Sequence, residues 1–199
     1  MKLSNISKSY DNKKIIDSLS LELPKNGTVA VMGPSGYGKT TLLRIIAGLE
    51  KADSGNITDK GERVSYAFQE PRLFPWLSAL DNVVLSCDDR DQALEWLSLV
   101  ELGSDAAKLP HELSGGMEQR VSLARALAYD ADLYIMDEPF TGLDEGLKSR
   151  LYALVKERSK TALVLLVTHD RAETEALANE IITFESSPLS KYTKTKNRE

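Results

Sequence analysis

The sequence has very little cysteine and no long apolar run. Cys87 is its one cysteine, which excludes an internal disulfide bond and fits a cytosolic setting. The longest strongly apolar stretch is "ALVLLV" at 162–167, whereas a membrane-spanning helix needs about 20 such residues. The first residues, "MKLSNISKSYD", lack the apolar run of a signal peptide. Any link to a membrane is therefore expected to run through a partner protein.

An excess of positive charge is also missing. The 199 residues include 25 Lys and Arg against 30 Asp and Glu, a net charge of −5. Nucleic-acid binders usually present a basic face, so this balance argues against a nucleic-acid partner. With 42% hydrophobic and 28% charged residues, the composition is typical of a globular domain with a sizeable core.

Short apolar runs bounded by turn residues predict strands that are buried on both faces, as in a parallel sheet. These runs lie at 28–32, 133–136 and 162–167. Helical patterns at 40–48 and 145–158 alternate with them, and the first would end at Gly48 as a C-terminal cap. The second would bury one apolar face made of Leu147, Leu151, Leu154 and Val155. The alternation predicts an α/β domain with a mostly parallel sheet.

The middle of the chain has a different pattern. No buried strand is recognisable between about 71 and 113, and "DQALEWLSLVEL" places Leu94, Leu97 and Val100 at helical spacing. This predicts a helical subdomain over about 71–130, inserted into the core.

The two ends of the chain are predicted to flank this core. Short mixed strands at 1–22 and 56–68 predict a small antiparallel sheet at its edge. The core domain is expected to span 1–185, and the polar, mildly basic segment 186–199 to form a mobile tail.

The stretch "GPSGYGKTT" at 33–41 follows a predicted strand and opens a predicted helix. It fits G-x-x-x-x-G-K-[ST], in which glycines let backbone N–H groups surround phosphates. Lys39 would reach the β- and γ-phosphates, the Thr40 hydroxyl would bind Mg²⁺, and the bulky Tyr37 must point away from the phosphates. A chance glycine-rich turn is the alternative, which the flanking strand and helix disfavour. The expected binding residues are Gly33, Pro34, Ser35, Gly36, Tyr37, Gly38, Lys39, Thr40 and Thr41.

Asp137 and Glu138 follow the apolar run at 133–136. The carboxyl ends of parallel strands line the ligand crevice of such a sheet. Asp137 is then placed to support Mg²⁺, and Glu138 to orient or polarise an attacking water. Two acidic residues at an ordinary strand end are the alternative.

A second anion site is predicted in "HELSGGMEQRVSLARAL" at 111–127. Ser114, Gly115 and Gly116 stand directly before a helix-forming run, where free N–H groups and the helix dipole favour negative charge. A routine serine cap is the alternative. A second phosphate site in one small chain calls for an explanation.

Together these motifs resemble the nucleotide-binding subunit of an ABC transporter, over nearly the whole chain from Leu3 to about Glu185. "LSGGMEQRVSLARAL" is similar to the signature motif of that family. The resemblance implies that two subunits pair head to tail, with ATP between the phosphate loop of one and the signature motif of the other. Ser114 and Gly116 would then contact the γ-phosphate in trans, which accounts for the second site.

Other positions match landmarks of the family. Tyr10 matches the aromatic residue that stacks on adenine, with an exposed surface tyrosine as the alternative. Gln69 matches the glutamine that touches Mg²⁺ and water and links to the membrane subunit. Asp144, in "TGLD", matches the loop that crosses the dimer interface. His169, in "LLVTHD", matches the histidine that contacts the γ-phosphate.

The stretch "FQEPRLFPWLSALDNV" is similar to importer subunits of the nitrate, sulfonate and taurine group. Phe74, Pro75 and Trp76 could form part of a groove for a permease helix, with core packing as the alternative. The resemblance implies an ATPase that powers import of a small solute from the cytoplasmic face of the membrane. Its partners would be a second ATPase subunit, an integral membrane permease and, indirectly, an extracytoplasmic solute-binding protein.

Some features depart from the family pattern. Glu118 stands where a basic or amide residue is common, "TGLD" replaces the more frequent "SALD", and the chain ends soon after "IITFESS". These differences are expected to affect the coupling of ATP hydrolysis to transport and its regulation, rather than ATP hydrolysis itself. Competing classes are a DNA-repair or translation factor of the same superfamily, a small-molecule kinase and an exporter. Such factors usually carry two cassettes, zinc modules or coiled coils, a kinase needs no second nucleotide site, and exporters are often fused to membrane spans.

Overall fold

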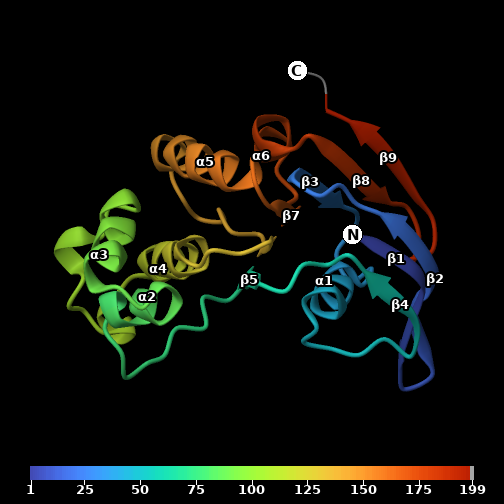
Figure 1. Ribbon diagram of the computed structural model, residues 1–199, viewed down its shortest axis with the longest axis horizontal. Helices are drawn as coiled ribbons and strands as arrows, with labels where there is room; N and C mark the ends of the chain where they lie inside the picture. Colours follow the sequence, from blue (N-terminus) through green and yellow to red (C-terminus); the bar gives the residue numbers. More distant parts are fainter. Residues whose placement is uncertain (198–199) are drawn as a thin grey trace.

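The computed structural model describes residues 1–197. Its larger sheet has mostly parallel strands and a small antiparallel sheet lies beside it (Figure 1). In spatial order, the strands of the larger sheet are β5 (Val64–Ala67), β6 (Leu133–Asp137), β7 (Leu163–Val167), β3 (Gly27–Met32), β8 (Glu180–Phe184) and β9 (Tyr192–Lys196). All neighbouring pairs are parallel except β8 and β9.

The three predicted buried strands are confirmed as β3, β6 and β7. Every residue of β6 and β7 is buried, which is why their sequences are continuous apolar runs rather than alternating ones. Successive side chains point to opposite faces of the sheet. Leu133 and Ile135 join the apolar cluster on one face, while Tyr134 and Met136 join the cluster on the other.

The antiparallel sheet contains strands near the amino terminus, as predicted. It is built from β2 (Lys13–Glu22), β1 (Lys2–Tyr10) and β4 (Ser54–Thr58), in that order. The assignment of the whole segment 56–68 to this sheet is wrong, because β5 pairs in parallel with β6. Helix α4 (Gly115–Ala128) covers one face of β5, where the Ser65 hydroxyl donates to the Ala126 carbonyl at 2.7 Å.

Helices pack around the larger sheet. Helix α1 (Lys39–Ala47) ends at Gly48, which has a φ of 81° and caps the helix as predicted. Helix α5 (Glu145–Ser159) buries Leu147, Leu151 and Val155, whereas Leu154 is only partly buried. Helix α6 (Arg171–Leu177) follows β7. Within residues 1–197, every helix is too short or too polar to traverse a lipid bilayer.

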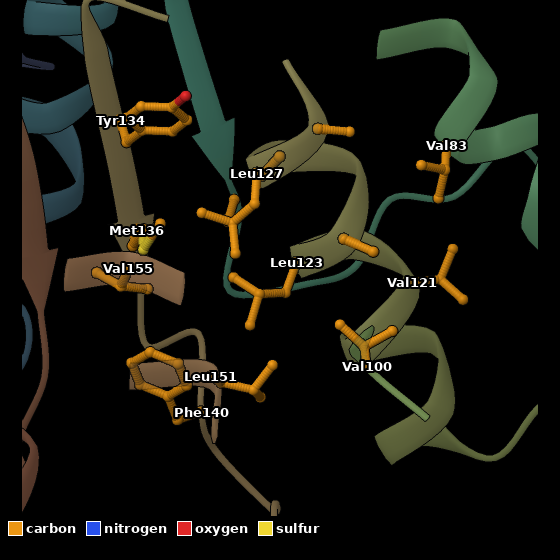
Figure 2. Close-up of a cluster of buried hydrophobic side chains, with 14 of the residues drawn as sticks. Val83, Val100, Val121, Leu123, Leu127, Tyr134, Met136, Phe140, Leu151 and Val155 are labelled. Atoms are coloured by element: carbon orange, nitrogen blue, oxygen red, sulfur yellow. The ribbon is translucent and has the colours of Figure 1, made fainter. Parts of the chain in front are cut away.

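A group of helices lies at the end of the molecule opposite the antiparallel sheet (Figure 1). It consists of α2 (Ala79–Cys87), α3 (Arg90–Leu99) and α4 (Gly115–Ala128). Figure 2 shows Val83, Val100 and Val121 of this group on the side of α4 away from β6. The expectation for Leu94 is wrong, since its side chain is 40% exposed. Ala93, Leu97 and Val100 form the buried face instead, at i, i+4 and i+7.

The polar carboxyl-terminal segment differs from the mobile tail that its composition predicts. Residues 192–196 form β9, antiparallel to β8, and the Tyr192 ring packs edge-on against Phe184 at 6.0 Å between centroids. The Asn197 amide donates to the carbonyls of Thr174, Glu175 and Ala178 at the end of α6. Strand pairing uses backbone groups, so a polar segment can join a sheet edge. Residues 198–199, also part of that expectation, lie outside the described residues.

The apolar core is divided by the larger sheet into two clusters. Figure 2 shows one of them, in which Leu123 and Leu127 of α4 face Met136 of β6 and Leu151 of α5. This cluster connects the helical group to the sheet and therefore fixes the position of α4.

We expect Leu127→Ala to lower the free energy of unfolding by about 2–5 kcal/mol, because it leaves a cavity in this cluster. Leu127 has no exposed surface. The control is Leu94→Ala, at a partly exposed position of α3, which should change stability by about 0.5 kcal/mol or less. Urea unfolding of the two variants measures the difference, and equal stabilities would contradict this account of the core.

Candidate functional site

A cavity of about 390 Å³ lies at the carboxyl ends of β3, β6 and β7. This is the edge of a parallel sheet at which ligand sites occur. It brings together most of the residues predicted from the phosphate loop and the strand ends. Those on its wall are Ser35, Gly36, Gly38, Lys39, Thr40, Thr41, Gln69, Asp137, Glu138 and His169.

The phosphate loop, residues 33–41, forms one wall of the cavity. Gly38 precedes α1 with a φ of 102°, and a Cβ there would lie 2.4 Å from Ile15 Cγ2, so both backbone conformation and space require glycine. A Cβ on Gly36 would meet no atom within 4 Å, which shows that this part of the loop is open to a ligand. Tyr37 packs against the apolar cluster and is not on the cavity wall, as its size predicts.

Lys39 lies across the phosphate loop. Its Nζ donates to the carbonyl of Gly33 at 2.6 Å and to that of Pro34 at 3.0 Å. Burial lowers the pKa of this ammonium group, and the nearby Glu138 and Asp137 oppose that effect. Lys39 Nζ is therefore held at the cavity with little water around it, where an anionic ligand would stabilise its charged form.

Asp137 and Thr40 place two oxygen ligands side by side. The Thr40 hydroxyl donates to Asp137 Oδ2 at 3.0 Å. Burial raises the pKa of Asp137, while the Thr40 hydrogen bond lowers it. Hydroxyl and carboxylate oxygens are the ligands that Mg²⁺ prefers. Among residues 1–197 no three His, Cys, Asp or Glu side chains form a metal cluster, so Mg²⁺ would fit here with further oxygens from phosphate or water.

Glu138 lies at the centre of the polar side chains in the cavity. Its Oε1 is 3.3 Å from His169 Nε2, and its Oε2 is 3.5 Å from the Gln69 amide nitrogen. The backbone turns sharply here, with a φ of 51°, and the Glu138 N–H donates to the Val167 carbonyl at 2.9 Å. The hydrogen bond to β7 holds this uncommon conformation. A carboxylate so placed can accept a proton from a water in the cavity.

The predicted second anion site lies outside this cavity. Ser114 and Gly115 are exposed at the start of α4, and a Cβ on Gly115 would meet no atom within 4 Å. Ser114 Oγ accepts from the Met117 N–H at 3.3 Å, so the serine does cap the helix. Gly116 faces the loop that precedes α5, since a Cβ there would lie 4.0 Å from the Gly142 carbonyl. The start of α4 is thus open to a group that approaches from outside the chain.

Gly33, Pro34, Tyr10 and Asp144 were also predicted and are absent from the cavity wall; the carbonyls of Gly33 and Pro34 instead accept from Lys39. Tyr10 is 42% exposed, hydrogen-bonds to Glu50 and lies 5.3 Å from Lys8 Nζ. Asp144 is exposed and caps α5 by accepting from the Leu147 N–H at 3.0 Å. Conversely, Ile15 and Val167 line the cavity without having been predicted. The sequence gives no reason to assign an apolar strand residue to a ligand site. Ile15 lines the cavity only because the fold brings β2 close to it.

The aromatic residues after Gln69 are at the surface. Phe74 and Trp76 are 42% and 70% exposed, with ring centroids 5.6 Å apart, and Pro75 is exposed as well. Core packing is therefore wrong for these side chains. Phe74 borders a hollow of about 420 Å³ whose wall includes Leu49, Tyr66, Phe68, Arg72 and Leu85. Large exposed apolar side chains around a hollow are typical of a protein-binding surface.

Comparisons with known proteins point to one family. The sequence profile of a family described as "ABC transporter" matches residues 16–141. The aliphatic sulfonates import ATP-binding protein SsuB of Bacillus cereus is 39% identical over an alignment that covers 92% of this chain and 78% of that protein. The protein of the same name from Yersinia pestis is 41% identical, and the alignment covers 94% of this chain and 73% of that protein.

Solved structures have the same fold. A dimeric ATP-binding cassette in a post-hydrolysis state, bound to ADP and Pi, superposes with a TM-score of 0.88 at 29% identity. The superposition covers 100% of this chain and 99% of that chain. A dimeric bacterial ABC transporter cassette superposes with a TM-score of 0.87, also at 29% identity and with the same coverage.

Proposed function

We propose that this chain, which belongs to the ABC transporter family, is the ATP-hydrolysing subunit that powers import of a small solute through a separate membrane permease. The observation that carries the proposal is the single cavity that unites the phosphate loop, the Asp137–Thr40 pair and the Glu138–His169 contact. The relatives from Bacillus cereus and Yersinia pestis, both named as import ATP-binding proteins, support the direction of transport.

In this proposal the phosphate loop holds ATP. Its backbone N–H groups surround the phosphates, and Lys39 Nζ exchanges its bonds to Gly33 and Pro34 for phosphate oxygens. Thr40, Asp137 and Gln69 hold Mg²⁺, which when bound neutralises charge on the phosphates. Tyr10 stacks on the adenine from its exposed position in β1.

Glu138 acts on the water. Its carboxylate orients the attacking water and takes up its proton, and Gln69 fixes the carboxylate from one side. His169 offsets charge on the γ-phosphate from the other side. Because the chemistry is phosphoryl transfer to water, it depends mainly on positioning and on charge stabilisation, which fixed side chains on strand ends supply.

We further propose that the functional unit is a head-to-tail pair. Ser114, Gly115 and Gly116 lie outside the cavity of their own chain and are open to an approaching group. They would complete the ATP site of the partner, with Asp144 and its loop crossing the interface. The relatives solved as dimers support pairing of such cassettes.

The docking surface for the permease is assigned to Phe74, Pro75 and Trp76 and the hollow beside them. An apolar hollow rimmed by aromatic rings suits a short helix of a membrane protein. Through that permease the chain would lie at the cytoplasmic face of the membrane and act indirectly with a solute-binding protein.

A pull-down tests the transport role. Tagged Glu138→Gln protein is expressed in its native host, supplied with ATP and Mg²⁺, and recovered from gently solubilised membranes. A multi-span membrane protein should co-purify. Recovery of ribosomes, DNA or soluble proteins alone would contradict the transport role and favour a soluble factor of the same superfamily.

We expect Lys39→Ala to weaken ATP binding by roughly 10- to 100-fold, because charge-assisted hydrogen bonds to the phosphates are lost. Titration with ATP measures the Kd. Lys25→Ala, at an exposed position away from the cavity, is the control and should bind ATP as the parent does. Equal Kd values for the two variants would refute the assigned role of Lys39.

We expect Glu138→Gln to bind ATP but to lower kcat by about 100-fold or more, because an amide cannot take up the proton. The variant should accumulate as a dimer with ATP and Mg²⁺, which size-exclusion chromatography detects. Glu62→Gln, exposed and away from the cavity, should hydrolyse ATP normally. Normal steady-state hydrolysis by Glu138→Gln would rule out the role proposed for this carboxylate.

We expect Trp76→Ala to abolish co-purification of the permease, because an exposed ring on the docking surface is lost. Its Tm should stay within about 2 °C of the parent, since the side chain is mostly outside the core. Leu99→Ala, which removes an exposed apolar side chain from α3, is the control and should retain the permease. Undiminished capture by Trp76→Ala would place the docking surface elsewhere.

A further inference from the structure

A buried lysine in the first turns of α5 lies between the "TGLD" loop and the segment that follows His169. Lys148 is almost fully covered, with 10% of its side chain exposed. Its Nζ lies 3.3 Å from Asp170 Oδ2 and 3.3 Å from Glu173 Oε1. Figure 1 shows α5 beside α6, the helix that begins just after Asp170. The lysine thus ties α5 to both the loop before α6 and α6 itself.

Lys148 Nζ also lies 3.4 Å from the exposed Glu145, but its other two acidic partners, Asp170 and Glu173, hold the backbone on both sides of His169. Glu173, with 5% of its side chain exposed, uses its second oxygen to accept from the Thr168 hydroxyl at 2.5 Å. That same hydroxyl accepts from the Asp170 N–H at 3.0 Å. Asp170 also caps α6 through the Ala172 N–H at 2.8 Å. The residues before and after His169 are therefore both fixed, and both chains of contacts lead to Lys148.

The backbone of Lys148 contacts the last residue of the "TGLD" loop. Asp144 is the last residue of this loop and the cap of α5, and its carbonyl accepts from the Lys148 N–H at 2.9 Å. A displacement of this loop therefore moves the start of α5 and Lys148 with it.

The positive charge of Lys148 is what holds the carboxylates of Asp170 and Glu173 near each other. The side chain of Glu173 is 5% exposed and that of Asp170 is 41% exposed. Without a cation between them, the buried carboxylate and its half-exposed neighbour would repel each other. Burial lowers the pKa of Lys148, but the hydrogen bonds to Glu173 and Asp170 outweigh it and the pKa is raised. Lys148 therefore stays charged at neutral pH, and its ammonium group fixes the distance between the two acidic side chains.

We propose that Lys148 is a positioning residue for ATP hydrolysis, which sets the loop of His169 relative to the "TGLD" loop without touching the nucleotide. The inference rests on the role proposed for His169. In a pair of chains, it would let a shift of the "TGLD" loop at the interface change the place of His169 in the same chain.

The test compares variants that keep the fold. Lys148→Met leaves the buried Glu173 carboxylate without its cation and is expected to unfold readily. The double variant Lys148→Met/Glu173→Gln removes the buried charge as well and should keep a Tm near that of the parent. We expect its kcat for ATP hydrolysis to fall roughly tenfold or more, because His169 is displaced, with KM within about threefold. Lys148→Arg, which keeps the cation, should restore kcat to within about threefold.

Lys156→Met is the matched control, since Lys156 lies exposed further along α5; it should leave kcat and KM unchanged. A folded double variant with the parent's kcat would overturn the proposal, and so would a rise in KM alone. A double variant that cannot fold would also overturn it, because the network would then serve the fold itself.

A second comparison separates this proposal from the role of His169. Sensitive phosphate-release assays measure His169→Ala alone and together with the double variant. If Lys148 acts through His169, the additional loss of kcat should be less than about twofold, because the positioned group is already gone. A further tenfold loss would overturn the role of Lys148. Normal kcat in His169→Ala alone would instead refute the role of His169, and with it this use of Lys148.

Discussion

The parallel pairing of β3, β6 and β7 is the constraint on which the rest of the structure depends. In-register parallel strands end together, so the phosphate loop, Asp137 and the loop of His169 emerge at one edge although they are far apart in the chain. This pairing requires both sheet faces to be covered, which α1, α4, α5 and the antiparallel sheet accomplish. The polar side chains of the site are thus attached to strands that are packed on both faces by apolar side chains, which limits how far those strands can move.

The site itself contains groups that are only partly satisfied within the chain. Lys39 is bound to carbonyl oxygens of its own loop, Asp137 is buried with an elevated pKa, and Glu138 is held in a left-handed conformation. Each arrangement has a cost in stability that other contacts must offset. An anionic ligand with a cation would relieve the first two, which is the electrostatic reason that such a cavity favours nucleotide phosphates with Mg²⁺.

Several functional features face outward rather than into this cavity. Ser114 and Gly115 at the start of α4, Asp144 of the "TGLD" loop, and residues 74–76 are all exposed. An isolated chain therefore presents a nucleotide site together with surfaces that have no use inside it. The proposed pairing with a second chain and docking to a membrane protein would give each of these surfaces a function. The Lys148 network would connect one of these surfaces to the site through side chains that are already ordered.

The sequence by itself determined the local features: the phosphate loop, the buried strands, the Gly48 cap, and the acidic pair after 133–136. These depend on consecutive residues, whose spacing and backbone preferences can be recognised without knowing their neighbours in space. It also predicted that Tyr37 points away from the phosphates, because its side chain is too bulky to lie among them. Only the tertiary structure decided which strands pair and which side chains are covered. It placed β5 in the parallel sheet, paired the polar 192–196 with β8, exposed Trp76 and buried Lys148. Those outcomes depend on residues far away in the chain. Strands pair through backbone hydrogen bonds that any sequence can form, and the burial of a side chain depends on which other elements pack against it.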